Sequence, residues 1–331
     1  MELRRSTRPL RWVAMIAGLA VSGAAFGGTY PDKPITLVVP YGPGGNADLA
    51  ARALSATLQT EKLLPQSVVV VNRAGAGGII GTQYVQRSKP DGYTLLMARV
   101  GSQVVAPALN PVTPYKWSAL TPISLLETDP YVCVVRANSP LKTFRQLLAE
   151  IKASPGKLSY ATTSSMDASV VFPVKAFLDA GLSAKAATMV PYKGAGATIT
   201  AVMAGTVDFT CNALAPYLGG LRAGTLRALV VSTPHRLAEF PHTPTVAQLG
   251  MKNLEMVSGW NALYGPPGLP KKVIQYWTKV LSRLKGTPAW AEQCKRRGTS
   301  PKFYGPAKTY AFVKEQYHAY HALSKYIGPN R

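Results

Sequence analysis

The chain has 331 residues, of which 47% are hydrophobic, and this is enough apolar material for one large or two medium domains. Its formal net charge is +22, but the positive charges are spread along the chain, and no basic stripe alternates with stacking aromatic residues. The composition therefore argues against a nucleic-acid partner. It favours a basic solvated surface with some affinity for anionic membranes.

The first residues have the pattern of a secretory signal peptide. Four arginines within residues 4–11 form a basic region, residues 12–21 form an apolar run, and Ala25 and Gly27 are small residues suited to a cleavage site. The apolar run is too short for a membrane span, which needs about 20 residues. We expect residues 1–27 to be removed on export. This removal takes away four positive charges and one negative charge and lowers the net charge from +22 to +19.

Short apolar runs alternate with helical patterns after residue 28. The order is strand, helix, strand, helix, strand, and the apolar residues occupy both parities of each run, as in parallel strands that are buried on both faces. The segments are the strands "ITLVVP", "SVVVVN" and "GYTLLMA", a helix from about residue 48 to 59, and a helix after the glycines of "RAGAGG".

The same rhythm restarts near residue 130. Its expected strands are "PYVCVVR", "KLSYATT", "ATMVPY", "VDFTCN" and "LRALVVS", and the helices between them include residues 143–154, about 195–204, and 215–224. An apolar run at 257–265 leads into a proline- and glycine-rich stretch, and the chain is helical from Pro270 onward.

This pattern predicts a hinged, two-lobed α/β protein with parallel-rich sheets and two crossover strands. Residues 28–129 and 258–331 are expected to form lobe 1, and residues 130–257 lobe 2. Two strands that cross between the lobes would leave a hinge and a cleft.

Ligands of open parallel sheets bind beyond the carboxyl ends of the strands, and the loops there are rich in hydrogen-bond donors. The first is "YGPGGNAD" (41–48), whose glycine amides and following helix N-terminus suit a carboxylate or phosphate. Asp48 is interpreted most simply as the helix N-cap, with direct ligand contact as the alternative. Asn46 is the better contact candidate, because its amide is a neutral donor at the loop tip.

Two further loops follow in the first lobe. The glycines of "RAGAGGIIG" do not have the G-x-G-x-x-G spacing of a dinucleotide fingerprint, and no P-loop is present. Arg99 follows the third strand, close to Ser102, and can bind a carboxylate through two parallel N–H bonds. An ion pair with a structural role is an equal alternative for Arg99.

The corresponding loops of the second lobe also supply neutral donors. Hydroxyl groups, glycine amides and an amide side chain suit the second end of an anion. The candidates are Thr162, Ser164, Ser165, Tyr192, Lys193, Gly194 and Asn212.

The sequence lacks the usual arrangements for catalysis. It contains no G-x-S-x-G elbow and no H-E-x-x-H motif, and no loop brings an evident general base. His318 and His321 have no third ligand nearby, so no metal and no cofactor is expected. Three cysteines are too few for a disulfide scaffold, although one pair can bridge in an oxidising compartment and leave one free.

Several segments together carry a resemblance to a known family. They are "YPDKPITLVVPYGPGGNADLAAR", "VVVVNRAGAGGIIGTQYV", "KPDGYTLLM", "VPYKGAGATITAVMAGTVDF", "LRAGTLRALVVST" and "FPHTPTVAQLG". In this order they resemble the substrate-binding proteins of tripartite tricarboxylate transporters (Bug-type receptors) over essentially the whole mature chain. The resemblance implies a two-lobed, type II periplasmic-binding-protein (Venus-flytrap) fold. It also implies a periplasmic receptor that closes on a small carboxylate and delivers it to a large and a small membrane subunit. It also implies these contacts: Tyr41, Gly44, Asn46, Ala47, Asp48, Gly77, Gly78, Tyr192, Lys193 and Gly194.

The chain departs from the family pattern at three places. Arg99 stands where the family usually has a small polar residue, Val170 where it has a histidine, and Ala201 where it often has an acidic residue. Arg99 therefore suggests a second carboxylate or an aromatic acid as ligand. We expect a monomeric receptor that is not an enzyme. An exported α/β enzyme acting on a carboxylate is the alternative, and a basic adhesion protein that binds polyanions is a weaker one.

Overall fold

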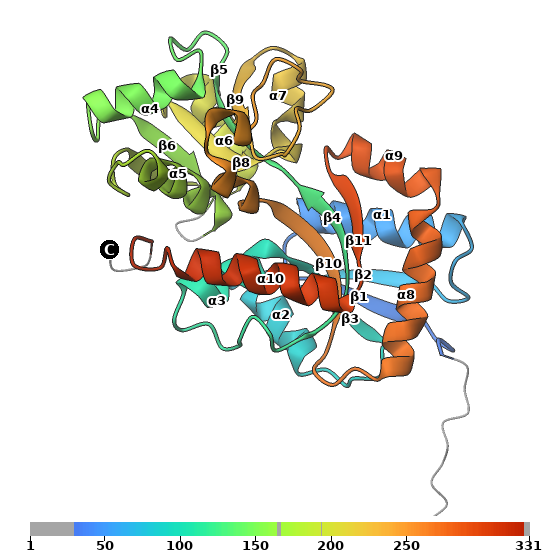
Figure 1. The fold of residues 1–331 in the computed structure, drawn as a ribbon. Helices are drawn as coiled ribbons and strands as arrows, with labels where there is room; N and C mark the ends of the chain where they lie inside the picture. The colour runs from blue at the N-terminus through green and yellow to red at the C-terminus, as the bar shows by residue number, and fades with distance from the viewer. Residues whose placement is uncertain (1–29, 164–166, 193, 328–331) are drawn as a thin grey trace, which may run out of the picture.

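The fold comes from a computed structural model, which describes residues 30–163, 167–192 and 194–327. Two sheets form two lobes that are connected by strands running between them (Figure 1). The sheet of the first lobe has six strands in the order β11-β4-β10-β3-β1-β2, and that of the second has five in the order β7-β6-β8-β5-β9. The expectation of a two-lobed α/β fold is confirmed.

In the first lobe, β1 lies between β2 and β3 and runs parallel to both, as the sequence predicts. The other three strands join antiparallel: β10 pairs with β3 and β4, and β11 with β4. Neither β4 nor β11 was identified from the sequence. The strands are β1 (Ile35–Val39), β2 (Val68–Asn72), β3 (Thr94–Arg99), β4 (Thr121–Asp129), β10 (Gly259–Gly265) and β11 (Ser300–Tyr304).

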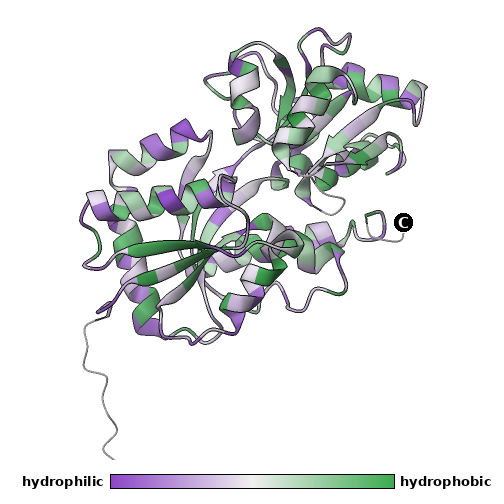
Figure 2. Cartoon of the chain, turned by 180° about the vertical axis from the view of Figure 1, so that it is seen from behind, coloured by the Kyte–Doolittle hydropathy of each residue, from purple (hydrophilic) through white to green (hydrophobic). Residues whose placement is uncertain are grey.

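Helices cover both faces of this sheet, because β1 and β3 bury apolar side chains on alternate faces. Ile35, Leu37 and Val39 pack with α1, α8 and α9, whereas Val38 belongs to the cluster that contains α2, α3 and α10. Figure 2 shows hydrophobic residues along these strands. The helices are α1 (Asn46–Thr60), α2 (Ile79–Gln86), α3 (Ala106–Leu109), α8 (Lys271–Lys285), α9 (Pro288–Arg296) and α10 (Pro306–His321), with short turns η1 (Ala76–Gly78) and η2 (Gly101–Val105).

The second lobe repeats the layered arrangement with one difference from the expected topology. β6 is parallel to β7 and β8, but β5 runs antiparallel to both β8 and β9. β5 continues directly from β4, so its direction is set by the crossing and not by a helical crossover within the lobe. The strands are β5 (Tyr131–Arg136), β6 (Ser159–Thr162), β7 (Thr188–Pro191), β8 (Phe209–Ala213) and β9 (Leu226–Val231).

Helices again lie on both faces of the second sheet. α6 and α7 share a cluster with Val132 and Val134, whereas α4 and α5 pack with Cys133 and Val135 on the opposite face. The helical segments are α4 (Phe144–Ala153), α5 (Ala168–Asp179), η3 (Ala215–Tyr217), α6 (Ala195–Ala204), α7 (Leu218–Arg222), η4 (Ala247–Leu249) and η5 (Lys252–Met256).

The chain crosses between the lobes twice. It leaves the first lobe where β4 runs through Pro130 into β5, and it returns through β10, which pairs with β4 from Gly259 to Gly265. The two crossover strands expected from the sequence are therefore β4 with β5 and β10, side by side (Figure 1).

Cys133 and Cys211 form a disulfide between the adjacent strands β5 and β8, and Cys294 is free and buried. The sequence allowed one disulfide and one free thiol, but it did not indicate which two of the three cysteines pair. The bridge closes a loop with a sequence separation of 78 residues, which contains α4, β6, α5, β7 and α6.

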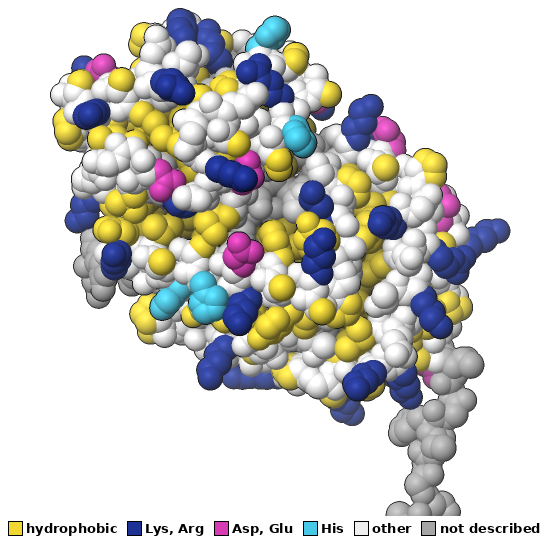
Figure 3. Space-filling view, viewed as in Figure 1, with side chains coloured by type: hydrophobic (Ala, Val, Ile, Leu, Met, Phe, Trp, Pro, Cys, Tyr) yellow, Lys and Arg dark blue, Asp and Glu magenta, His cyan; other side chains and the backbone are white. Residues whose placement is uncertain are grey.

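The surface carries its positive charge in a dispersed form. Lysine and arginine side chains are scattered over both lobes in Figure 3 and do not gather in one stripe on that face. Within residues 30–327, leaving aside the gaps at 164–166 and 193, no helix combines the length and apolar character needed to cross a bilayer.

Candidate functional site

The first glycine loop leads into α1, and the helix begins two residues before the expected start. Gly45 is the N-cap and Asn46 the first helical residue, so the interpretation of Asp48 as N-cap is wrong. The carboxylate of Asp48 instead folds back on the loop and accepts a hydrogen bond of 2.9 Å from the N–H of Gly44. The side chain of Asp48 thus stabilises the conformation of the first glycine loop. Gly44 itself has a φ of 76°, a conformation that suits glycine.

The end of β2 and the next turn of α1 hold the side chain of Asp48 in place. Asn72 at the end of β2 donates to Asp48 Oδ1 (2.9 Å) and to the carbonyl of Tyr41 (3.0 Å), and Arg52 Nε donates to Asp48 Oδ2 (3.0 Å). Burial acts to raise the pKa of Asp48, but the hydrogen bonds from Arg52, Gly44 and Asn72 outweigh it and hold that pKa below its usual value. The carboxylate is ionised and already accepts hydrogen bonds from Gly44, Arg52 and Asn72, as expected of a residue that stabilises the loop.

The second glycine loop packs against the first through Tyr41. A Cβ on Gly78 would lie 2.8 Å from Ser102 Cβ and 3.0 Å from Tyr41 Cζ, and one on Gly101 would lie 2.6 Å from the Tyr41 hydroxyl. Only glycine leaves room for the tyrosine ring at these two positions. The structure thereby brings three of the expected site residues together: Tyr41, Gly78 and Ser102.

The hydroxyl of Tyr41 is buried and has no hydrogen-bond partner among the described residues. Burial raises the pKa of Tyr41; the neighbouring Ser102 and Arg99 lower it, and Asp167 of the second lobe raises it further. The Tyr41 side chain is therefore a neutral hydrogen-bond donor.

Arg99 forms a buried ion pair at the point where the chain crosses between the lobes. Its Nη2 lies 2.9 Å from Oδ2 of Asp129, the last residue of β4, and only 15% of its side chain is exposed. Asn46 Nδ2 donates to the same oxygen (2.7 Å), and Asn46 Oδ1 accepts from Asn261 Nδ2 (2.8 Å) on β10. The side chains of Arg99 and Asn46 are thus tied to both crossover strands.

A second buried ion pair extends this network. Arg297 donates to both carboxylate oxygens of Glu127 at 2.7 Å each, and Asn261, Thr299 and Cys294 donate to the same carboxylate. Burial acts to raise the pKa of Glu127, but its bonds and charge interaction with Arg297 dominate and hold the pKa below its usual value. Sequence reasoning missed this group, although two acidic residues within an apolar strand ("SLLETD") were a signal.

The predicted second-lobe residues meet at the ends of β6 and β8. Thr162 and Asn212 are buried, and neither Thr162 Oγ1 nor Asn212 Nδ2 has a hydrogen-bond partner in the described ranges. Tyr192 donates its backbone N–H to the carbonyl of Thr162 (2.8 Å), and Gly194 caps α6 with a φ of 86°. Three further predicted residues lie outside the described residues: Ser164, Ser165 and Lys193.

Asp167, which sequence reasoning did not single out, caps the N-terminus of α5. Its Oδ1 accepts from the N–H (2.9 Å) and the hydroxyl of Ser169, and its Oδ2 accepts from the hydroxyl of Thr163. Burial raises the pKa of Asp167, although the bonds from Ser169 and Thr163 lower it. An aspartate before the apolar run "ASVVF" was a signal for such a cap.

The remaining expected residues lie on the same loops. Ala47 is buried in the first turn of α1, whereas Gly77 is exposed and has a φ of 66° within η1. Among the described residues, no group of three or more His, Cys, Asp or Glu side chains is arranged to hold a metal ion.

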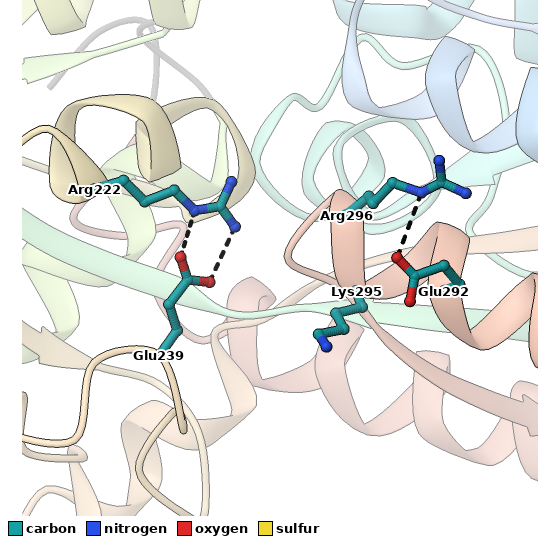
Figure 4. A pocket seen from close by; sticks show the side chains of 5 residues that line it. All are labelled: Arg222, Glu239, Glu292, Lys295 and Arg296. Carbon is teal, nitrogen blue, oxygen red and sulfur yellow. Dashed lines mark hydrogen bonds and ion pairs between the residues drawn. The ribbon is translucent and has the colours of Figure 1, made fainter.

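A separate pocket of about 480 Å³ lies outside these loops (Figure 4). Arg222 and Glu239 of the second lobe form one ion pair in it, and Arg296 and Glu292 of α9 form another, with Lys295 between them. Every lining side chain is charged, and none belongs to the expected site.

Residues 51–328 match the family of tripartite tricarboxylate transporter family receptors. The chain belongs to this family. It is 33% identical to the protein BugT of Bordetella pertussis over 303 residues, which cover 91% of each chain. The resemblance inferred from the sequence is confirmed, and the family consists of solute-binding receptors, not enzymes.

Solved structures agree with the family. The periplasmic binding protein BugD is 28% identical, with a TM-score of 0.77 and coverage of 91% of this chain and 100% of BugD. A protein of R. palustris, solved with adipate, is 25% identical with a TM-score of 0.80, and the match covers 91% of this chain and 100% of that protein. The chain therefore has the fold of periplasmic carboxylate receptors.

Proposed function

We propose that the mature protein is a periplasmic receptor that binds a small carboxylate between its lobes and delivers it to the large and small membrane subunits of a tripartite tricarboxylate transporter. One observation supports the proposal: three buried polar groups, on the first glycine loop and at the ends of two second-lobe strands, have no hydrogen-bond partner among the described residues. They are the Tyr41 hydroxyl in lobe 1, and Thr162 Oγ1 and Asn212 Nδ2 in lobe 2. A buried donor without a partner costs about 1–3 kcal/mol, which a bound anion would recover.

The same loops present backbone donors. α1 and α6 begin at glycine caps without side-chain hydrogen bonds, so the N–H groups of their first turns are available to an anion. We assign the contact of Asn46 to its backbone, because its amide side chain is engaged by Asp129 and Asn261. Only the closed arrangement of the lobes lets both donor sets engage one ligand, so binding stabilises closure.

The remaining parts of the proposal follow the sequence expectations. The signal peptide comprises residues 1–27, lobe 1 residues 28–129 and 258–331, and lobe 2 residues 130–257. The mature chain acts as a monomer. The ligand contacts are Tyr41, Gly44, Asn46, Ala47, Asp48, Gly77, Gly78, Arg99, Ser102, Thr162, Ser164, Ser165, Tyr192, Lys193, Gly194 and Asn212.

A thermal-shift screen of the mature protein tests the receptor function. The protein is unfolded and refolded to strip bound ligand and then heated with mono-, di- and tricarboxylic acids, aliphatic and aromatic. A ligand present at 100 times its dissociation constant stabilises the fold by about 2.7 kcal/mol, which gives a clear rise in Tm. We expect at least one carboxylate to do so.

A site control distinguishes cleft binding from surface binding. Asn212→Ala should abolish the shift caused by the hit, whereas Arg222→Ala, in the outer charged pocket, should leave it unchanged. A screen without any hit, or a hit unaffected by Asn212→Ala, would contradict the proposed site.

A further inference from the structure

The two lobes also meet away from the glycine loops, at the charged pocket of about 480 Å³ (Figure 4). It is lined by Arg222 and Glu239 of the second lobe and by Glu292, Lys295 and Arg296 of α9 in the first. Each of its two ion pairs stays within one lobe, and Lys295 lies between the pairs. The lobes therefore face each other here through charged side chains.

The backbone of one lobe touches the other beside this pocket. Gly298, two residues after α9, has a φ of 65°, and a Cβ built on it would lie 2.6 Å from Cδ1 of Leu218, the first residue of α7. Leu218 is buried in the apolar cluster of the second lobe, so it has little room to move aside. The absence of a side chain at Gly298 lets the end of α9 lie directly against α7.

Lys295 adds an attraction between the lobes. The hydrogen bond from Arg222 is the main cause that lowers the pKa of Glu239, and the charge of Lys295 lowers that pKa further from the opposite side of the pocket. Because 45% of the Glu239 side chain is exposed, this attraction is modest and is screened by salt. Arg222 is bonded to Glu239 inside the second lobe and does not bridge the lobes.

The order of the strands places this contact across the hinge from the proposed ligand site. In the first sheet, β11, which follows α9, lies on one side of the crossover strands β4 and β10, whereas β3, β1 and β2 lie on the other. In the second sheet, β9, which follows α7, lies on one side of β5, whereas β8, β6 and β7 lie on the other. The proposed ligand residues belong to the ends of β1, β2, β3, β6, β7 and β8. The crossover strands therefore separate the ligand side from the α7–α9 side.

A rotation about the crossover strands moves these two sides in opposite directions. When the lobes approach each other on the ligand side, α7 and α9 separate. When the ligand side opens, α7 and α9 approach. An attraction between α7 and α9 thus stabilises the open arrangement, and a group wedged between them stabilises the closed one.

We propose that the α7–α9 contact, made by Lys295 with Glu239 and by Gly298 with Leu218, favours the open arrangement of the lobes and thereby lowers the affinity for the ligand. This inference rests on the proposed closure of the lobes around a carboxylate. A receptor whose closed form is only partly populated binds with an apparent affinity reduced by that fraction, so weakening the contact tightens binding without any change in the ligand site.

Lys295→Gln removes the attraction between the lobes. Titration calorimetry of the stripped mature protein with succinate, adipate, citrate and benzoate as probes should show about 2- to 5-fold tighter binding than in the wild type, the range expected for an exposed ion pair. High salt should reduce the difference. Loss of a positive charge by itself weakens the binding of an anion, so tighter binding is specific to the contact. Lys157→Gln, in an exposed ion pair of the second lobe, is the matched control and should not tighten binding.

Gly298→Asn inserts a side chain between the lobes on the α7–α9 side. Asparagine tolerates a positive φ better than most residues, so the turn after α9 is retained. This variant should also bind the probes more tightly than the wild type. Gly268→Asn is the matched control in the same lobe, because Gly268 has a φ of 74° and a Cβ there would meet nothing within 4 Å.

Small-angle X-ray scattering of the stripped proteins tests the contact without any ligand. Lys295→Gln and Gly298→Asn should have a smaller radius of gyration than the wild type, and both controls should match the wild type. Unchanged or larger dimensions, or weaker binding of the probes in both variants, would overturn the role of the contact and leave the receptor function intact. If no probe binds the wild type, the receptor function fails, whereas the scattering still decides whether the α7–α9 contact holds the lobes open.

Discussion

The two sides of the proposed ligand site are built differently. On the first-lobe side, the charged and amide side chains are bound to one another: Arg99 to Asp129, Asn46 to Asp129 and Asn261, and Glu127 to Arg297. On the second-lobe side, Thr162 and Asn212 each leave one polar atom without a partner in the described part of the chain.

We call the bound side chains of the first lobe the frame. Its members are Arg99, Asp129, Asn46, Asn261, Glu127 and Arg297. The bound network joins the first glycine loop to both crossover strands through the side chain of Asn46, which bonds to Asp129 and Asn261. The second-lobe groups are held by their own strands and helix cap, and their free atoms can bind a ligand. We infer that the bound network of the first lobe maintains the geometry, and that the Tyr41 hydroxyl together with the second-lobe groups contacts the ligand.

Removal of Glu127 should have the largest effect on stability. Glu127→Gln leaves the guanidinium of Arg297 buried without its counter-charge, which costs about 3–5 kcal/mol in the free energy of unfolding. Urea unfolding measures the loss. The control is Glu150→Gln in the exposed pair with Lys157, which should change stability by less than about 1 kcal/mol. Similar losses in both variants would remove the distinction between the buried network and the surface.

Removal of the disulfide tests the second lobe. The Cys133→Ala, Cys211→Ala double variant loses a cross-link with a sequence separation of 78, and we expect a cost of about 2–5 kcal/mol. Thermal unfolding with and without a reducing agent measures it. The reducing agent should lower the Tm of the wild type toward that of the double variant and leave the double variant unchanged. A wild type insensitive to complete reduction would contradict the stabilising role.

Replacement of Arg99 tests whether a residue of the frame also contacts the ligand. Arg99→Ala should weaken binding by about 1.5–3 kcal/mol if the guanidinium makes a charge-assisted bond to the ligand. It also leaves Asp129 without its counter-charge, so Arg99→Ala with Asp129→Asn should recover part of the lost stability. Calorimetry and urea unfolding of both variants separate the two effects. Unchanged affinity in Arg99→Ala would restrict Arg99 to the frame.

The smallest of the predicted effects is the pH dependence of stability. It should have opposite signs for Glu127, on the first-lobe side, and Asp167, on the second-lobe side. Glu127 has a lowered pKa, so its contribution is present above its unfolded pKa and is lost as the pH falls through its folded pKa. Asp167 has a raised pKa, so its ionisation costs stability as the pH rises through its folded pKa, and the cost disappears at lower pH.

Unfolding at several pH values between about 3 and 7 measures these contributions. The stability advantage of the wild type over Glu127→Gln should shrink toward acid. Asp167→Asn should be at least as stable as the wild type at neutral pH, and its advantage should also shrink toward acid. A neutral-pH loss of stability in Asp167→Asn would show that this carboxylate belongs to the frame.

Much of the fold could be predicted because local patterns report local structure. β1, β2 and β3 were found as apolar runs, and the glycine loops between them and their helices were placed correctly, since tight turns and positive φ restrict the residue type. β11 was missed because it contains Pro301 and has no buried apolar run, and β4 because its buried residues include Glu127 and Asp129.

The sequence by itself determined the alternating α/β elements, the two-lobed architecture, the donor-rich loops and the family, because periodicity and glycine placement act over a few residues. Only the tertiary structure decided what those side chains do. Partners such as Asn46 with Asn261, or Arg99 with Asp129, are separated by 215 and 30 residues in the chain. Whether a charge is paired or free depends on which strands lie side by side, and no local pattern records that.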